Sequence, residues 1–374
     1  MNVIFTCGGT GGHIMPAIAV ANIWLQRHPD SNILFVGGKG GMEETLVPKA
    51  GFRLELLPAS GLSRGKNWAA LKRNARAVNQ VRQAVKRCKQ IIREFKPDVI
   101  VGTGGYASFP ALWAGARMGI PTCVHESNAV PGLTTRMIAG KVDRVLVCFP
   151  ESVSRFRDPG KVEVVGMPVR QEFIYTEKEA ARKELGLDSR PLIVTAFGSQ
   201  GAKVMNEITG KLFCLEQDAG YPFNHIHAVG SYGWGWMPDY VRRQGVDLSK
   251  TDAIRMLEYI YNMPTVMAAA DVIISRAGAS SCNEIAASGT PCILIPSPNV
   301  TDNHQEKNAR AMEREGAATV ILEKDCSAEL LMAQIRDLLE NQDRYSQMRK
   351  ALLNMVVPDS AQRLCNIMEQ LAGK

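Results

Sequence analysis

The sequence contains no uninterrupted apolar run long enough to span a membrane, although residues 1–26 carry no charged side chain apart from a protonatable His13. A secretory signal needs a basic start followed by an unbroken apolar stretch. Here the apolar segment 1–7 runs directly into the glycine-rich segment Gly8–His13. The pattern therefore predicts neither a signal peptide nor a spanning helix, and we expect the protein to stay on the cytoplasmic side.

Paired cysteine motifs and Asp-x-Asp triplets are also missing. The nine cysteines are scattered, and no two form a Cys-x-x-Cys pair, which argues against a disulfide scaffold or a zinc ribbon. Without an Asp-x-Asp triplet, no obvious carboxylate pair is present to hold a metal on a diphosphate. We therefore expect no bound metal, and we expect backbone dipoles and arginines to stabilise a charged leaving group.

Two common nucleotide-binding motifs are incomplete. In Gly9–Ile14 the third glycine of the dinucleotide fingerprint is replaced by Ile14, and no acidic residue ends the second expected strand near Gly37. The segment Gly61–Asn67 is one residue too short for a P-loop and ends in Asn. These departures argue against nicotinamide cofactors and against kinase or ATPase chemistry, so we expect no cofactor.

The 374 residues suffice for about two domains, and 45% hydrophobic with 22% charged residues is typical of a globular protein. One unit recurs: a short apolar run, a glycine-rich turn and a helical pattern, with turns at Gly8–Gly9, Gly102–Gly105 and Gly198–Gly201. This repetition predicts an α/β protein with doubly wound parallel sheets. A strand that breaks near 164–169 suggests a domain boundary, with a ligand cleft between two similar domains.

Glycine turns between a strand and a helix let backbone N–H groups approach a ligand at the positive end of the helix. A single turn of this kind can equally be a simple bend. Three at equivalent positions favour binding of phosphate or sugar.

The net charge of +7 is concentrated in one segment. Residues 64–96 contain eleven Lys or Arg and one acid, Glu94, which gives 11 − 1 = +10 and leaves 7 − 10 = −3 elsewhere. From Trp68 to Phe95 apolar residues recur every three or four positions, which predicts a helix with one apolar stripe. The helix could pack on the sheet with a solvated basic back, or the basic face could contact an anionic membrane. Nucleic-acid binding is disfavoured because no reader motif accompanies the charges.

Six segments together resemble the MurG family of UDP-N-acetylglucosamine:lipid I transferases. They occur in the order seen in that family, and the resemblance runs from about residue 1 to residue 320. The segments are Gly8–His13, Gly104–Tyr106, His125–Asn128, Val165–Arg170, Gly198–Ala202, and Arg276–Gly278 through Asn283–Glu284 to Gly289–Pro291.

The resemblance implies the GT-B glycosyltransferase fold, with two Rossmann-like domains facing across a cleft. Residues 1–165 would form an acceptor-binding and membrane-facing domain, which a C-terminal helix at 356–374 could complete, and residues 166–355 would bind the UDP-sugar donor. The implied reaction is inverting transfer of N-acetylglucosamine to the 4-hydroxyl of lipid I, which forms the β-1,4 disaccharide of lipid II in peptidoglycan synthesis.

The resemblance also implies a location and partners. The enzyme would be peripheral on the cytoplasmic face of the bacterial inner membrane, with Arg64–Lys96 against the anionic surface. Its partners would be UDP-N-acetylglucosamine, lipid I, and proteins of cell-wall synthesis and division.

By position, the resemblance implies a set of substrate-binding residues. Phe109 and His304 depart from the usual family residues, which leaves the acceptor pocket and the sugar-hydroxyl contacts less defined than the nucleotide contacts. The implied donor contacts are Thr10, Gly11, Gly12, Asn128, Arg170, Ser199, Ile260, Ala279, Ser280, Ser281, Cys282, Asn283, Glu284 and Gln305. Gly104, Gly105 and Tyr106 are the other implied substrate-binding residues.

Physical roles can be given to several of these positions. The Glu284 carboxylate could accept hydrogen bonds from two ribose hydroxyls, or it could only stabilise a helix N-terminus. Arg170 and Arg276 could each contact the diphosphate, the alternative for each being a structural ion pair. Ser199 could donate to phosphate or cap a helix.

Inverting transfer needs a base to take the proton of the attacking hydroxyl. His13 is the first candidate, because it opens a helix whose dipole would favour a neutral imidazole. Its alternative roles are to hydrogen-bond the sugar or to cap the helix. Glu126 is the rival base, and its alternative role is that of a structural carboxylate. His225 and His227 are predicted to be packing or surface residues.

An epimerase or a galactolipid synthase on the same fold would share the glycine turns. Such an enzyme would not be expected to have Gly104–Tyr106 and His125–Asn128, which favour the lipid I transferase.

Overall fold

A computed structural model describes residues 1–9, 11–58, 68–300 and 303–373, with only the backbone described for residues 68–78. The chain divides into two compact units. Unit 1 comprises Met1–Val169 and Val357–Lys374, and unit 2 comprises Arg170–Val356. The chain therefore passes from one unit to the other twice, and each unit is described by itself.

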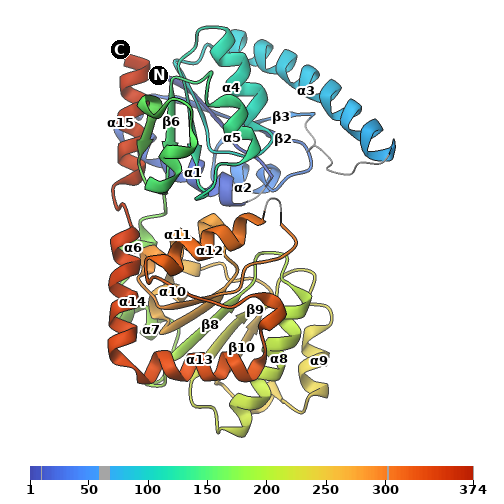
Figure 1. Cartoon of the computed structure of the whole chain (residues 1–374), viewed down its shortest axis with the longest axis vertical. Coiled ribbons are helices and arrows are strands. Elements are labelled where there is room, and N and C mark those ends of the chain that lie inside the picture. Colours follow the sequence, from blue (N-terminus) through green and yellow to red (C-terminus); the bar gives the residue numbers. More distant parts are fainter. Residues whose placement is uncertain (10, 59–67, 301–302, 374) are drawn as a thin grey trace. The chain divides into compact units, whose positions relative to one another are not determined.

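Unit 1 is built on a seven-stranded sheet in the order β3-β2-β1-β4-β5-β6-β7, in which every pair of neighbouring strands is parallel (Figure 1). Because parallel strands need crossover connections, helices cover both faces of such a sheet. The strands are β1 (Asn2–Thr6), β2 (Asn32–Gly38), β3 (Arg53–Leu57), β4 (Val99–Gly102), β5 (Thr122–Glu126), β6 (Arg144–Val147) and β7 (Val162–Val164).

Alternate residues of β1 enter two separate cores, as expected when both faces of a strand are buried. Val3 and Phe5 face a core shared with α1 and α15, whereas Ile4 faces the core that α3 and α4 cover. The helices of unit 1 are α1 (Gly11–Arg27), α2 (Glu43–Lys49), α3 (Trp68–Phe95), α4 (Ser108–Arg117), α5 (Leu133–Ile138) and α15 (Ser360–Gly373), with 3₁₀ turns η1 (Pro150–Arg155) and η2 (Pro159–Lys161).

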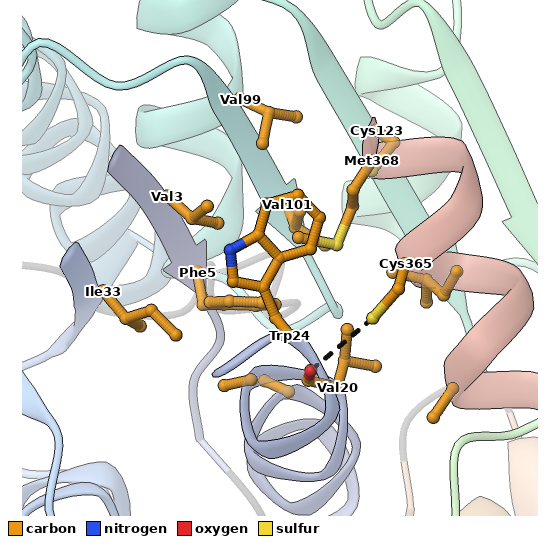
Figure 2. Packing of buried hydrophobic residues seen from close by; sticks show 14 of the residues in the cluster. Val3, Phe5, Val20, Trp24, Ile33, Val99, Val101, Cys123, Cys365 and Met368 are labelled. Atoms are coloured by element: carbon orange, nitrogen blue, oxygen red, sulfur yellow. Dashed lines mark hydrogen bonds between the residues drawn. The ribbon is translucent and has the colours of Figure 1, made fainter. Parts of the chain in front are cut away.

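The C-terminal helix α15 packs against α1, more than 300 positions earlier in the sequence. Cys365 and Met368 reach the same core as the fully buried Trp24, and the Cys365 thiol lies 3.8 Å from the Val20 carbonyl oxygen (Figure 2). Burying a large aromatic side chain removes much apolar surface from water. The buried face of α15 is therefore part of the core of unit 1.

The basic helix α3 packs against α4. In its described half, the apolar positions Ala84, Cys88, Ile91 and Ile92 are buried in the core. In this half of the helix the predicted apolar stripe therefore packs into the core. The basic side chains Arg82, Lys86 and Arg93 are exposed. Within the described parts of the chain, no helix combines the length and the apolar character needed to cross a membrane.

Unit 2 contains a six-stranded sheet in the order β10-β9-β8-β11-β12-β13, again parallel at every pairing. The strands are β8 (Leu192–Ala196), β9 (Asn224–Ala228), β10 (Ile254–Leu257), β11 (Val272–Ser275), β12 (Cys292–Leu294) and β13 (Thr319–Val320). The helices are α6 (Glu172–Tyr175), α7 (Lys178–Glu184), α8 (Lys203–Asp218), α9 (Met237–Arg243), α10 (Met263–Ala269), α11 (Ala279–Ser288), α12 (His304–Arg314), α13 (Ala328–Glu340) and α14 (Gln342–Met355), with 3₁₀ turns η3 (Leu248–Lys250) and η5 (Glu323–Asp325).

A buried polar chain crosses β8 and β9. The Thr195 hydroxyl lies 2.8 Å from His225 Nε2 and 2.7 Å from His227 Nδ1, and Glu216 lies 2.6 Å from His225 Nδ1. Burial lowers the pKa of His227 to about 3, so this ring is neutral at pH 7. Both histidines are therefore buried packing residues. Three of their four ring nitrogens are bonded to Thr195 or Glu216, and His227 Nε2 has no partner among the described residues.

Both sheets have a topological switch point, where the strand order reverses. In unit 1 it lies between β1 and β4, and in unit 2 between β8 and β11. Ligands of open parallel sheets bind at the carboxyl ends of the strands beside such a point. The predicted α/β class with two parallel sheets is confirmed, and the glycine turns lie next to these two positions.

Candidate functional site

In unit 1 the turns after β1 and β4 touch through their backbones. Gly104 and Gly105 have φ values of +101° and +81°, which side chains of L-residues rarely adopt. A Cβ atom on Gly105 would lie 2.1 Å from the Gly8 carbonyl oxygen. Only glycine permits this contact, which joins the two predicted turns into one backbone surface at the switch point.

His13 lies in the first turn of α1 and is bonded to the turn after β4. Its Nδ1 lies 3.0 Å from the Thr103 carbonyl oxygen, and the Thr103 hydroxyl donates to the His13 carbonyl at 2.6 Å. Because a carbonyl can only accept, Nδ1 carries the proton and a neutral ring has its lone pair on Nε2. The tautomer is therefore the one that a proton acceptor at Nε2 requires.

Glu126 ends β5 and organises the loop that follows. Its Oε1 accepts from the backbone N–H of Asn128 at 2.9 Å and from the Asn128 side-chain amide at 2.8 Å, and its Oε2 accepts from Gly132 at 2.9 Å. The residue is buried. Both carboxylate oxygens therefore accept hydrogen bonds from Asn128 or Gly132. This arrangement agrees with the structural role that the sequence also allowed for Glu126.

The preceding residue, His125, is fully buried, and its Nε2 lies 2.9 Å from the Gly166 carbonyl oxygen. Desolvation is the main reason that its pKa is lowered. His125 therefore links the end of β5 to the segment by which the chain leaves unit 1.

In unit 2 the turn after β8 lies against the turn after β9. Gly201 has φ +78°, and a Cβ atom there would lie 2.0 Å from the Val229 carbonyl oxygen. The carbonyls of Ser199 and Gln200 accept from the N–H groups of Ser231 at 3.2 Å and Tyr232 at 3.1 Å. Ser199 itself is exposed, so its side chain is accessible at the edge of this fixed turn.

The turn from β11 into α11 carries the polar groups with unmet hydrogen-bonding capacity. Burial raises the pKa of Glu284 to about 7, which the positive charge of Arg170 opposes. No residue in the described ranges donates a hydrogen bond to the Glu284 carboxylate. Arg170 Nε and Ser280 Oγ are buried and equally lack a partner among the described residues. Since buried polar groups normally have partners, this cluster is suited to a polar ligand.

The remaining unit 2 positions are mostly engaged within the fold. Ile260, three residues after β10, is buried. The Gln305 side chain accepts from the Ser297 N–H at 2.8 Å, and Asn283 donates to the Ala279 carbonyl at 2.8 Å. Cys282 is also buried, whereas Ala279 and Ser281 are partly exposed in the first turn of α11. The predicted Thr10 lies outside the described residues.

The structure resolves one alternative and reveals one residue that the sequence analysis missed. Arg276 is nearly buried, pairs with Glu323 and donates to the Ile295 carbonyl at 3.1 Å, so it is a structural ion pair. Glu43 is fully buried and accepts from the N–H groups of Gly9 and Gly38. A glutamate two residues after the glycine-rich segment Gly37–Gly41 was the available signal for it.

Two protein-family models match the chain, the glycosyltransferase family 28 N-terminal domain at residues 3–147 and the C-terminal domain at residues 192–364. An enzyme of Acetivibrio thermocellus named UDP-N-acetylglucosamine–N-acetylmuramyl-(pentapeptide) pyrophosphoryl-undecaprenol N-acetylglucosamine transferase is 39% identical, over 99% of this chain and 98% of the relative. A Thermoanaerobacter sp. protein of the same name is 41% identical, over 99% and 100%.

The chain belongs to the MurG family of glycosyltransferases.

A solved structure supports this membership. Acinetobacter baumannii MurG superimposes with a TM-score of 0.75 at 25% identity, covering 99% of each chain. The S. aureus MnaA–UDP structure has a TM-score of 0.71 at 13% identity, covers 100% of this chain and 97% of its own, and shares the fold alone. The predicted family, the GT-B fold and the enzyme class are confirmed.

Replacement of Glu284 by Gln should stabilise unit 2 at alkaline pH. A carboxylate whose pKa rises from 4.5 to about 7 on folding reduces stability as the pH increases through that range. Removing its charge should raise the free energy of unfolding at pH 8 by roughly 1–3 kcal/mol, and by much less at pH 5. Urea unfolding at both pH values measures this.

The exposed Glu179→Gln in α7 is the matched control and should change stability little at either pH. An equal gain for Glu284→Gln at pH 5 and pH 8 would show that burial of the charge is not the cause.

Proposed function

We propose that this enzyme transfers N-acetylglucosamine from UDP-N-acetylglucosamine to the 4-hydroxyl of the N-acetylmuramoyl unit of undecaprenyl-pyrophosphoryl-MurNAc-pentapeptide. The product would be the β-1,4-linked disaccharide of the peptidoglycan precursor. The observation that carries the proposal is membership of the MurG family. The relatives that match this chain over nearly their full length are named for this reaction. Two sets of glycine turns at switch points, one in each unit, agree with it.

In this mechanism unit 2 holds the nucleotide. The Glu284 carboxylate would accept hydrogen bonds from the ribose hydroxyls, which would supply the donors that it lacks. Arg170 Nε, Ser280 Oγ and the Ser199 side chain, with the N–H groups at the start of α11, would hold the diphosphate. These groups would stabilise the charge that develops as the bond between the anomeric carbon and the diphosphate oxygen breaks.

Unit 1 would hold the acceptor and supply the base. The 4-hydroxyl oxygen forms a bond to the anomeric carbon from the side opposite the leaving UDP, which inverts the configuration. We assign the departing proton to His13 Nε2, because the bond from Nδ1 to Thr103 leaves the lone pair there. Glu126 would position Asn128 and Gly132, and Gly104, Gly105 and Tyr106 would line the acceptor side.

Incubation of the protein with UDP-N-acetylglucosamine and a soluble lipid I analogue tests the proposal. Release of UDP together with formation of the disaccharide is the expected result. The fold is shared with UDP-N-acetylglucosamine 2-epimerases, which are 12–14% identical to this chain. Inversion at C2 of the sugar in the absence of acceptor would therefore point to an epimerase and overturn the assignment.

Replacement of His13 by Ala should lower kcat by about 10²–10⁴-fold, since general-base assistance acts in the transition state. The affinity for UDP should change little, because His13 belongs to unit 1. The comparison is Glu126→Gln, which should mainly raise the KM of the acceptor. Normal turnover of His13→Ala at saturating substrates, with turnover lost in Glu126→Gln, would exchange the two roles.

Replacement of Glu284 by Ala should weaken binding of UDP-N-acetylglucosamine at least tenfold, since a hydrogen bond to a charged group contributes about 1.5–3 kcal/mol. The wild-type affinity should also fall as the pH drops below about 7, where Glu284 gains a proton. Calorimetric titration at pH 6 and pH 8 measures both effects. Unchanged UDP affinity in folded Glu284→Ala, as expected for the Glu179→Ala control, would remove Glu284 from the ribose site.

We further propose that the enzyme is peripheral on the cytoplasmic face of the inner membrane and that Arg64–Lys96 contacts its anionic lipids. The exposed cations of the described half of α3 support this. Each Lys or Arg near such a surface contributes about 1 kcal/mol within a Debye length of roughly 8–10 Å. Residues 59–67, which include Arg64 and Lys66, and the side chains of 68–78 lie outside what the structure describes.

Replacing Arg64, Lys66, Lys72, Arg73 and Arg76 with Gln should release the protein from anionic vesicles and slow transfer to membrane-embedded acceptor. UDP affinity and the rate with a soluble acceptor should stay the same. The matched control removes five exposed cations of unit 2: Lys183, Lys211, Arg242, Arg243 and Lys250. Co-sedimentation unaffected by the first set and by salt would show that the charged segment is only a solvated face.

A further inference from the structure

Glu43, the first residue of α2, is a fully buried carboxylate near Tyr106, which is proposed to line the acceptor side. Its Oε2 accepts from the Gly9 N–H at 3.2 Å and its Oε1 from the Gly38 N–H at 2.8 Å. Among the described residues no lysine or arginine pairs with it. Burial of a charge is unfavourable unless hydrogen bonds replace water, and here backbone N–H groups of two different turns do so.

The surroundings of Glu43 are shaped to admit its side chain. A Cβ atom on Gly37 would lie 2.6 Å from Glu43 Cγ, and one on Gly41 would lie 2.2 Å from Oε2. On Gly8 it would lie 2.9 Å from Oε1. Gly8, Gly37 and Gly41 therefore leave room for the Glu43 side chain. Glycine is needed at these positions for this space as well as for the turns.

Tyr106 closes the same arrangement from the turn after β4. Its ring lies where Cβ atoms on Gly9 and Gly38 would approach within 3.3 Å and 2.9 Å. Burial, and then the negative charge of Glu43, raise the pKa of the Tyr106 hydroxyl. Glu43 and Tyr106 thus connect the turns after β2, β1 and β4, which are adjacent strands in the sheet.

The bond to Gly9 fixes the backbone that follows β1. Gly9 has φ +90°, and its N–H donates to Glu43. The two glycines that donate to the carboxylate, Gly9 and Gly38, are also the two that lie against the Tyr106 ring. Glu43 therefore fixes the backbone surface on which this ring packs.

We propose that Glu43 is a positioning residue for the acceptor: it holds the backbone at Gly9 and Gly38 against the Tyr106 ring, and so keeps Tyr106 in place on the acceptor side. The inference rests on the proposed function, because that function places the acceptor in unit 1. It predicts a selective effect on the acceptor, because Tyr106 is proposed to line the acceptor side.

The test compares Glu43→Gln with Glu44→Gln in the complete chain. The amide introduced by Glu43→Gln keeps the shape of the side chain, but its NH₂ group cannot accept from the second N–H. Glu44 is the matched control because it bonds the Gly40 N–H at 2.6 Å from an exposed position in the same segment. For Glu43→Gln we expect the acceptor KM to rise about tenfold or more, with an unchanged Kd for UDP and faster hydrogen exchange at residues 8–9 and 37–38. Glu44→Gln should match the wild type in all three.

Gly41→Ala provides a second variant, since its Cβ would displace the Glu43 carboxylate without removing the charge. It should raise the acceptor KM in the same way and covers the case in which Glu43→Gln does not fold. Wild-type acceptor KM in both variants would overturn the proposal, as would equal losses of acceptor and UDP binding. If the wild type fails to use the lipid I analogue, the proposed function falls, and the hydrogen-exchange comparison still decides whether Glu43 holds the turn.

Discussion

Direct contact between backbones at the carboxyl ends of the strands is the constraint on which both units depend. Gly105 meets the carbonyl of Gly8 in unit 1, and Gly201 meets the carbonyl of Val229 in unit 2, each at a distance that no side chain tolerates. These contacts bring neighbouring turns close enough for their N–H groups to face one ligand. A negatively charged phosphate can then be held by dipoles that are already oriented, without a resident cation.

Three glutamates near these turns differ in the hydrogen bonds that their carboxylates accept. The difference distinguishes residues that fix loops from a residue that is suited to bind a ligand. Glu43 and Glu126 have both oxygens occupied by N–H donors, so their charges serve to fix loops. Glu284 has no such donors among the described residues, and burial raises its pKa to about 7 although the charge of Arg170 opposes the shift. A buried carboxylate without hydrogen-bond donors reduces stability, which is a common feature of ligand-binding positions.

Much of the fold could be predicted because it depends on local patterns. Apolar runs followed by glycine turns, such as 2–9 and 192–201, identified the strands, the parallel sheets and the carboxyl-edge location of the predicted site residues. The apolar stripe of Trp68–Phe95 predicted a helix, and its described half is buried at Cys88, Ile91 and Ile92. The strand order, which places the switch points, arises from contacts between distant segments and was not predicted.

Residues whose role depends on distant partners escaped the sequence analysis. Glu43 is one of many glutamates until β1 and β2 pair and bring Gly9 and Gly38 to it. Arg276 could be given two roles, and only the position of Glu323, 47 residues later, decides for the ion pair. The assignment of individual contacts to donor or acceptor remains a prediction, because it depends on where the ligands lie.

The return of α15 to unit 1 has a consequence for biosynthesis. The core that contains Trp24 also contains Cys365 and Met368, so it stays incomplete until the ribosome has made all of unit 2. At roughly 5–20 residues per second, residues 170–356 take about ten to forty seconds to synthesise. During that interval the nascent first unit lacks the apolar side chains of α15, and its completion follows, rather than precedes, the synthesis of the second.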